Sequence, residues 1–246
     1  MADNGMKMFN FFLVFLIACT LPMWYGVQSF MEAGIFTKLL WVFGVTGFFC
    51  VPLLLYLGRF AFIIIGKILK YRVFNPLPDP SQVLKEHVFS GFVSPTDLDH
   101  FLHMNNARYL RELDFARTAF YGDSGLILYL QSTGVRLIMS ACVVRYRKSL
   151  QPFQRFRVTT KITYWDDDSF YFQHSFLSRF KTHSDFVYAT ILTKMHCTGQ
   201  TPIQILCGML SLDNPPEKPQ LSKELELFIN YNKESSQRLR NETKNE

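Results

Sequence analysis

Apolar residues dominate the first part of the chain in two long stretches, whereas apolar and polar positions alternate over short periods in the rest. The stretches cover residues 9–27 and 39–66, and Glu32, Lys38 and Arg59 are the charged residues within and between them. A helix needs about 20 apolar residues to cross the hydrocarbon core of a bilayer, so each stretch is long enough. We therefore expect an N-terminal membrane anchor of one or two apolar helices, either two spans or one span plus an interfacial helix.

The first stretch also fits a secretory signal peptide, because Lys7 precedes its apolar run and Pro22 breaks it. The aromatic pair Trp24 and Tyr25 suits a lipid-headgroup region better than a cleavage site, which needs small residues. Cleavage would also leave the second stretch in place. Secretion after signal cleavage stays open as the alternative to an anchored protein.

Basic residues set the expected orientation of the anchor. Lys67, Lys70 and Arg72 follow the second stretch directly. Positive residues beside a span favour the cytosolic side of a membrane. Arg59 lies near the end of the stretch, and we expect its long side chain to reach the interface. The rest of the chain should face the cytosol from an internal membrane, with the endoplasmic reticulum as the first choice.

After the anchor, the periodicity of the sequence predicts a mixed α+β body. Apolar residues spaced three and four apart predict a helix over residues 105–121. β-branched, aromatic and alternating positions predict five strands, at residues 87–93, 135–148, 156–165, 169–178 and 186–197. We expect the helix to pack against a curved antiparallel sheet.

These elements divide the chain into four parts. We expect the anchor at residues 1–72, a proline-rich linker at 73–86, a folded domain at 87–212 and a polar tail at 213–246 with a helical patch at 223–240. Prolines at this density disfavour both helix and central strand in the linker. A body of this length supports one well-buried core.

Composition and charge exclude several classes of function. The net charge is +6, but no long run of Lys and Arg occurs, so we expect no nucleic-acid partner. Cys142, Cys197 and Cys207 are scattered through the body and lack both a disulfide framework and the Cys-x-x-Cys spacing of a zinc site. Three aspartates at residues 166–168 favour a turn over a calcium site, because consecutive side chains diverge. We predict no metal and no cofactor.

Residues 97–109 combine acidic, imidazole and amide side chains directly before the predicted helix. Backbone amides at a helix N-terminus lack intrahelical partners and favour an anion or a developing oxyanion. A carboxylate beside them can act as general base or nucleophile. The segment is a candidate acyl-transfer site. In the alternative, Asn105 or Asn106 only caps the helix, and Asp97 and Asp99 are turn residues.

The block from Asp97 to Arg117 has the form Asp-x-Asp, then His-Met-Asn-Asn-Ala-Arg-Tyr-Leu-Arg-Glu-Leu-Asp-Phe-Ala-Arg, and it resembles the signature of hotdog-fold acyl thioesterases. It is similar to the 4-hydroxybenzoyl-CoA thioesterase group and, in its His-x-Asn-Asn part, to plant acyl-carrier-protein thioesterases. The likeness continues at residues 146–150, 165–167 and 230–237, in family members that also carry an apolar N-terminus. It implies a hotdog fold, in which an antiparallel sheet wraps around a long helix.

The resemblance also implies roles for individual residues. Asp99 matches the family's catalytic carboxylate, and it would attack the thioester directly or activate water. The amide of Asn106 would polarise the thioester carbonyl. His103 and Asn105 would position substrate or water, and Tyr109, ten residues after the acid as in the family, would contact substrate.

Two further features bear on this site. Arg145 and Arg147 would meet the phosphates of CoA, unless they form a solvated strand face. Phe101 and Leu102 stand where bacterial members of the family have a glycine that lets the backbone approach the thioester. Their bulk would obstruct the site.

The resemblance leads to two hypotheses for function. The first is a membrane-anchored enzyme that hydrolyses fatty acyl-CoA or related acyl thioesters, because a tethered domain samples acyl chains that partition into the bilayer. The second is a catalytically inactive hotdog module that binds acyl lipids or a protein partner at the membrane. Hotdog domains usually pair through their sheets, so the resemblance also implies a homodimer.

Overall fold

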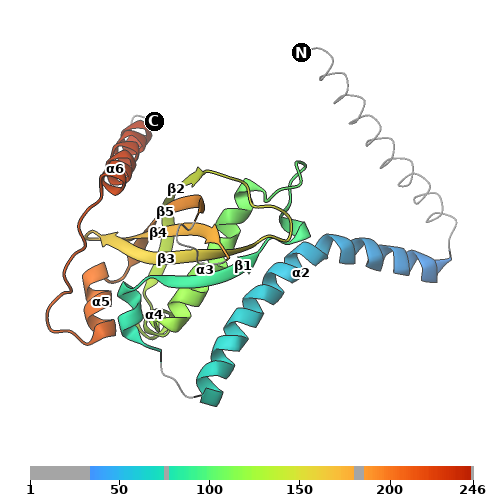
Figure 1. Cartoon of the computed structure of the whole chain (residues 1–246), viewed down its shortest axis with the longest axis horizontal. Helices are drawn as coiled ribbons and strands as arrows, with labels where there is room; N and C mark the ends of the chain where they lie inside the picture. Colours follow the sequence, from blue (N-terminus) through green and yellow to red (C-terminus); the bar gives the residue numbers. More distant parts are fainter. Residues whose placement is uncertain (1–33, 75–77, 180–185, 245–246) are drawn as a thin grey trace, which may run out of the picture. The chain divides into compact units, whose positions relative to one another are not determined.

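The computed structural model of the chain describes residues 34–74, 78–179 and 186–244 (Figure 1). The chain divides into two compact units, residues 1–58 and 59–246. Helix α2 (Ile35–Phe74) is 40 residues long and begins in the first unit and ends in the second. The folded domain and the candidate site lie in the second unit.

Five antiparallel strands form one sheet in the second unit. They are β1 (His87–Phe92), β2 (Arg136–Tyr146), β3 (Arg155–Trp165), β4 (Ser169–Ser178) and β5 (Val187–Thr198). Their order across the sheet is β1-β3-β4-β5-β2, so β1 and β2 are its edge strands. The β3–β4 and β4–β5 pairs are consecutive in the chain, whereas β2 pairs with β5 across the intervening strands.

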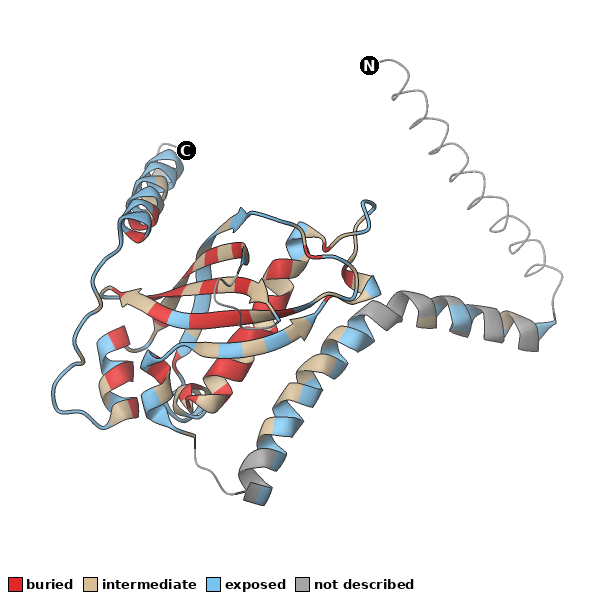
Figure 2. Ribbon diagram, viewed as in Figure 1, coloured by how far each residue is buried: buried red, intermediate tan, exposed pale blue. Residues whose placement is uncertain are grey.

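Helix α3 (Asn106–Asp123) packs across one face of this sheet. Leu113 and Ala116 of the helix are fully buried together with Phe156 of β3 and Ile191 of β5. Every second side chain from Ala189 to Cys197 is buried, because successive side chains of a strand point to opposite faces. Figure 2 shows the resulting core as red segments along α3 and the strands.

Short helices close the domain, and one longer helix lies on the other face of the sheet. The short ones are η1 (Pro80–Leu84), η2 (Pro95–Asp97), α4 (Leu126–Thr133) and α5 (Pro202–Leu210). The longer one is α6 (Lys223–Lys244), whose Leu225, Phe228 and Ile229 pack against Tyr171 of β4. We call the sheet face that carries Tyr171, opposite α3, the outer face.

The observed elements agree with the predicted α+β class. The long helix and all five predicted strands are present, with ends shifted by no more than two residues, and α6 covers the predicted helical patch. Helices α4 and α5 were not predicted, and η1 lies inside the predicted linker. Helix α4 has only eight residues between Gly125 and Gly134, both in the left-handed region at φ 74° and 72°. Such a short segment shows too few turns for a clear helical period.

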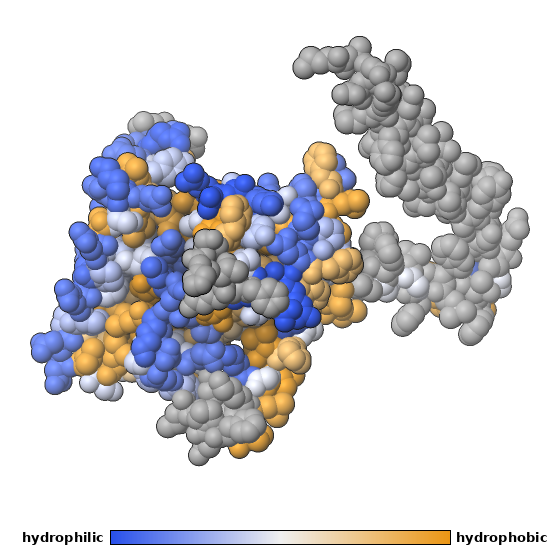
Figure 3. Space-filling model, in the orientation of Figure 1, coloured by the Kyte–Doolittle hydropathy of each residue, from blue (hydrophilic) through white to orange (hydrophobic). Residues whose placement is uncertain are grey.

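The end of α2 packs against α3 within the second unit. The rings of Phe60 and Phe115 lie 5.3 Å apart, and Lys67 forms an ion pair with Asp123. Phe62, by contrast, is 79% exposed. Figure 3 shows apolar surface, in orange, along this part of α2. The helix thus directs some charged side chains to the domain and apolar ones to solvent.

The described residues do not support the predicted transmembrane helices. No helix in residues 34–74, 78–179 and 186–244 is both long and apolar enough to cross a membrane. The predicted span at residues 39–66 forms part of α2. The predicted span at residues 9–27 lies outside the described residues.

Candidate functional site

Buried Asp97 organises the segment before α3. Its carboxylate accepts a hydrogen bond from the Ser94 amide (2.9 Å) and pairs with the guanidinium of Arg111. Its carbonyl oxygen accepts a hydrogen bond from the Asn105 amide (2.8 Å). The side chain is fully buried. Asp97 therefore holds the two ends of the following loop together, which is a structural role.

Asp99 lies in the loop that these contacts close. Its amide donates a hydrogen bond to the His103 carbonyl (3.0 Å), and one carboxylate oxygen accepts a hydrogen bond from the Phe101 amide (2.9 Å). The other carboxylate oxygen lies 3.2 Å from Nδ1 of His103, without the alignment of a hydrogen bond. Both side chains keep some solvent access. The loop thus brings together the predicted acid and the predicted imidazole.

The N-terminus of α3 presents an available amide next to this loop. Asn105 caps the helix, because its side-chain oxygen accepts a hydrogen bond from the Ala107 amide (2.9 Å). The capping alternative is therefore confirmed for Asn105. The Asn106 amide has no hydrogen-bond partner within the described part of the chain. It lies at the positive end of the helix dipole, where an oxyanion is favoured.

Tyr109, which was predicted to contact substrate, belongs to the core. The side chain is 1% exposed, and its ring lies 5.2 Å from that of Tyr146 and 5.0 Å from that of Phe176. Its hydroxyl accepts a hydrogen bond from the Leu150 amide (3.2 Å), and burial raises its pKa. The ring therefore packs between α3 and the sheet and is shielded from solvent.

The bulky pair Phe101 and Leu102 points largely into solvent. The two residues are 70% and 68% exposed, so most of their bulk does not fill the loop. Leu102 has φ 58°, in the left-handed region that glycine adopts without strain. Residue 102 therefore has the backbone conformation typical of glycine although it is a leucine, which lowers the folding stability by about 1–2 kcal/mol.

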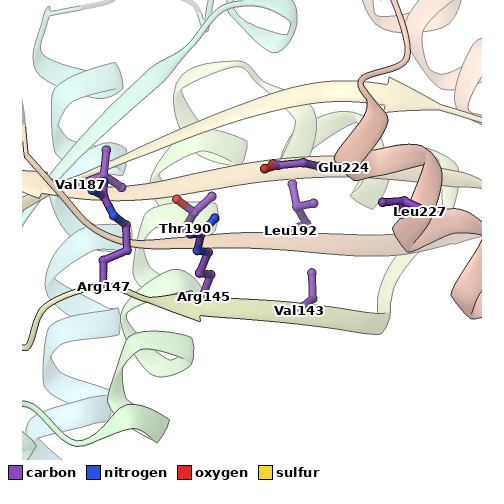
Figure 4. A pocket seen from close by; sticks show the side chains of 8 residues that line it. All are labelled: Val143, Arg145, Arg147, Val187, Thr190, Leu192, Glu224 and Leu227. Carbon is purple, nitrogen blue, oxygen red and sulfur yellow. The ribbon is translucent and has the colours of Figure 1, made fainter.

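Arg145 and Arg147 do not reach the start of α3. Tyr146 stands between them and donates a hydrogen bond to the Asn106 carbonyl (2.8 Å), so it faces α3. Because side chains alternate along a strand, its two neighbours point to the outer face. There they line a separate pocket (Figure 4). The predicted site residues thus divide between two faces of the sheet.

A buried ionic network that was not predicted connects α2 to α3 and the loop. Arg59 donates two hydrogen bonds to Glu112, at 2.6 and 2.7 Å, and Arg111 lies 3.8 Å from the same carboxylate while it binds Asp97. Burial raises the pKa of Glu112, although the Arg59 hydrogen bonds oppose this shift. Arg59, which was predicted to reach a membrane interface, therefore binds Glu112 of the domain. The sequence indicated this ion pair only indirectly, because a lone arginine in an apolar stretch needs an acidic or polar partner.

The aspartates at residues 166–168 form a turn, as predicted. Asp166 accepts hydrogen bonds from the amides of Asp168 (3.1 Å) and Ser169 (2.8 Å). Within the residues that the structure describes, no three His, Cys, Asp or Glu side chains are grouped so that they could hold a metal ion.

Comparison with known proteins identifies the family. A family model for the thioesterase-like superfamily matches residues 93–217, which include the loop, α3 and most of the sheet. This chain belongs to that superfamily. Protein THEM6 of Xenopus laevis is 40% identical over 166 residues, which cover 68% of this chain and 78% of that protein. Protein THEM6 of Danio rerio is 35% identical over 169 residues, covering 69% of this chain and 80% of that protein.

Solved structures also match part of the chain. A probable thioesterase of Escherichia coli, YbaW, matches with a TM-score of 0.45 at 19% identity, over 50% of this chain and 95% of that one. In a member of this superfamily, an antiparallel sheet around one long helix is the hotdog thioesterase fold. The predicted hotdog fold of the domain is thereby confirmed, whereas the predicted transmembrane region is not supported.

Proposed function

We propose that this chain hydrolyses fatty acyl-CoA or a related acyl thioester, with Asp99 as the reacting carboxylate. The observation that carries the proposal is the position of Asp99 in a loop closed onto the start of α3, where the Asn106 amide has no partner among the described residues. Membership of the thioesterase-like superfamily supports the class of reaction. Fold alone would not, because one fold hosts many activities.

The proposed mechanism uses the helix start and the acid together. The thioester carbonyl oxygen accepts a hydrogen bond from the Asn106 amide, and the helix dipole stabilises the charge that develops on it. Asp99 either attacks the carbonyl carbon, which expels the thiolate and leaves an anhydride for water to hydrolyse, or takes a proton from an attacking water. Both routes give a carboxylic acid and a thiol. His103, 3.2 Å away, orients the carboxylate or the water.

The test compares Asp99→Asn with Asp167→Asn in the full-length chain. Asparagine keeps an oxygen to accept the Phe101 hydrogen bond but removes the charge, so the loop shape is retained. Palmitoyl-CoA hydrolysis should fall by a factor of about 100 or more. Asp167 is exposed in a turn, so its variant should hydrolyse at the wild-type rate. Equal rates for Asp99→Asn and wild type would show that Asp99 does not react.

Isotope labelling can establish the covalent route. Repeated turnover in ¹⁸O-water places label in the Asp99 carboxylate if that residue attacks the thioester and water then opens the anhydride at the Asp99 carbonyl carbon. Label appears only in the fatty acid if Asp99 acts as a general base or if water opens the anhydride at the acyl carbonyl carbon, so label in Asp99 is the diagnostic result. Mass spectrometry of the peptide that contains Asp99 measures the difference.

A non-catalytic acyl-binding module is the second candidate. It is favoured by the commitment of Asn105 to a helix cap and of Tyr109 to the core, since neither is then free to position a substrate. A thioether analogue of palmitoyl-CoA, which cannot be hydrolysed, distinguishes the candidates. The module binds this analogue with wild-type and Asp99→Asn protein alike and releases no thiol from palmitoyl-CoA.

We propose that α2 attaches the chain to the cytosolic face of an internal membrane, such as that of the endoplasmic reticulum. The distribution of side chains supports an interfacial helix, because Arg59 and Lys67 pair with α3 while Phe62 and Leu69 are exposed. Flotation of the full-length chain with vesicles tests this. Phe62→Glu combined with Leu69→Glu should reduce flotation, and undiminished flotation would count against α2. Recovery from the medium of a chain lacking residues 1–27 would support secretion instead.

A homodimer paired through β2 is the proposed assembly. Strand β2 is an edge of the sheet, and its Ile138 and Met139 are 52% and 40% exposed. An uncovered edge strand with apolar side chains invites pairing with a second strand. Light scattering after gel filtration should give the mass of two chains, and Ile138→Lys should shift it toward one chain. A monomeric wild type would refute the assembly.

A further inference from the structure

The outer face of the sheet carries a pocket that plays no part in the proposed hydrolysis. Its volume is about 490 Å³, and it lies between strands β2 and β5 and the first turns of α6 (Figure 4). The start of α3 lies on the opposite side of the sheet, as the Tyr146 hydrogen bond to Asn106 shows. A molecule in this pocket would therefore be distinct from a thioester held at Asp99.

The polar side of the pocket is cationic. Arg145 lies near the end of β2 and Arg147 directly after it, both in the lining of the pocket, and Thr190 of β5 pairs with Arg145 across the sheet. Neither guanidinium forms an ion pair with a carboxylate among the described residues, and Glu224 is the acidic residue in the lining. Figure 4 shows the side chains of Arg145, near the end of β2, and of Arg147, directly after it, extending toward β5. Phe186 lies under Arg147, with the guanidinium 5.0 Å from its ring centroid.

The other side of the pocket is apolar. Val143 and Leu192 are paired across β2 and β5, and Leu227 of α6 stands beside them. Val143 is 47% exposed and Leu227 is 60% exposed, so both keep apolar surface in contact with water. Covering such surface with an aliphatic chain is favourable by about 25 cal/mol per Å². The pocket therefore combines a site for a negative group with a surface for a hydrocarbon.

We infer that this pocket binds a single-chain amphiphile with a phosphate head. Arg145 and Arg147 hold the phosphate, and its aliphatic chain lies on Val143, Leu192 and Leu227. Two guanidinium groups match the charge and the oxygen geometry of a phosphate monoester better than those of a single carboxylate. The inference does not depend on hydrolysis at Asp99, so it stands or fails independently of the proposed function.

Octyl phosphate is the probe for this pocket. Its binding to the full-length chain in phosphatidylcholine nanodiscs is measured by the broadening of its ³¹P NMR line, and the broadening caused by empty nanodiscs is subtracted. Arg145→Gln and Arg147→Gln should each weaken binding at least about tenfold, because each removes a charge-assisted hydrogen bond. Arg136→Gln is the matched control, since it removes the same charge from an exposed position on the same strand. Its affinity for octyl phosphate should equal that of wild type.

Further probes separate the two halves of the pocket. Leu227→Ser should weaken octyl phosphate and leave the weak binding of inorganic phosphate unchanged, whereas Arg145→Gln should weaken both. Vesicles with and without phosphatidic acid then show whether a bilayer also presents the ligand. Binding of octyl phosphate that both arginine variants reduce supports the inference, and a parallel reduction of vesicle binding shows that a bilayer also presents the ligand.

Three results would overturn the inference. The first is equal affinity of wild type for octyl phosphate and inorganic phosphate, which would show that the apolar side of the pocket does not contribute to binding. The second is binding of CoA, lost in both arginine variants, without binding of octyl phosphate, which would assign the arginines to the thioester substrate. The third is a failure of octyl phosphate to bind, together with a change of molecular mass in both variants, which would show that a second copy of this chain covers the pocket.

Discussion

Replacing Arg59 with methionine removes the partner of a buried carboxylate while it keeps most of the side-chain length. Glu112 is fully buried and receives both of its short hydrogen bonds, at 2.6 and 2.7 Å, from Arg59. The guanidinium also lies 4.2 Å from the centre of the Phe115 ring. Among the described residues, the variant therefore leaves Arg111, at 3.8 Å, as the remaining cation beside Glu112.

The expected loss of stability follows from that geometry. Removing one partner of a buried ion pair costs about 3–5 kcal/mol, because the other charge stays buried and unpaired. Arg111 remains nearby and the Arg59 side chain is 26% exposed, so we expect the lower end, about 3 kcal/mol. For a domain of this size that lowers Tm by about 6–12 °C.

The loss should depend on pH with a definite sign. Burial already raises the pKa of Glu112 in the wild type, and removing Arg59 raises it further. Because the pKa of Glu112 is higher in the folded state than in the unfolded chain, the folded state binds more protons between these two pKa values. The free energy of unfolding therefore falls as the pH rises through this range. The deficit of Arg59→Met should therefore be largest above neutral pH and shrink as Glu112 becomes protonated in acid.

Urea unfolding of the full-length chain in mild detergent, followed by tryptophan fluorescence, measures these free energies. Lys67→Met is the matched control, because its partner Asp123 is partly exposed and the loss should be about 1 kcal/mol or less. Arg59→Met combined with Glu112→Met should recover most of the stability, since no charge is then left buried. A loss for Arg59→Met no larger than that of the control, or no recovery in the double variant, would refute the reasoning.

Three other predictions concern single side chains. Leu102→Gly should be more stable to urea than Leu102→Ala by about 1 kcal/mol, because only glycine relieves the left-handed φ of 58°. Burial lowers the pKa of His174 to about 3, so below pH 6.5 the unfolded chain binds a proton at this residue that the folded state does not. As the pH is lowered from 6.5 to 4, the free energy of unfolding should therefore fall more steeply for wild type than for His174→Gln, by about 1.4 kcal/mol per pH unit. Burial raises the pKa of Cys197 to about 12, so at pH 8 maleimide should modify exposed Cys142 and spare Cys197, as peptide mass spectrometry will show.

The sheet and α3 could be predicted because their burial follows a simple period. In β5 every second residue is buried, and the alternation of apolar and polar residues in the sequence reports this directly. In α3 the buried side chains recur every three or four residues, from Tyr109 through Leu113 and Ala116 to Phe120. Helices α4 and α5, with eight and nine residues, are too short for such a period to stand out.

The candidate site was predicted in part, because sequence spacing reports neighbours within a loop but not contacts across the fold. Asp99 and His103 are four residues apart and meet in the loop. Arg59 and Glu112 are separated by 53 positions and belong to different helices, so no pattern links them. Arg145 could not be placed either, because a strand's alternation does not reveal which of its faces meets α3.

The Asp-x-Asp pair shows how the local environment gives identical side chains different roles. Asp97 is fully buried, its charge is matched by Arg111, and its oxygens are occupied by Ser94 and Arg111. Asp99 is partly accessible, and its second oxygen lies 3.2 Å from Nδ1 of His103. A carboxylate that reacts must be accessible to the substrate. A carboxylate that holds a loop together must instead stay bound to its hydrogen-bond partners. Asp97→Asn should therefore act mainly through stability and Asp99→Asn mainly through turnover, and the reverse result would exchange their roles.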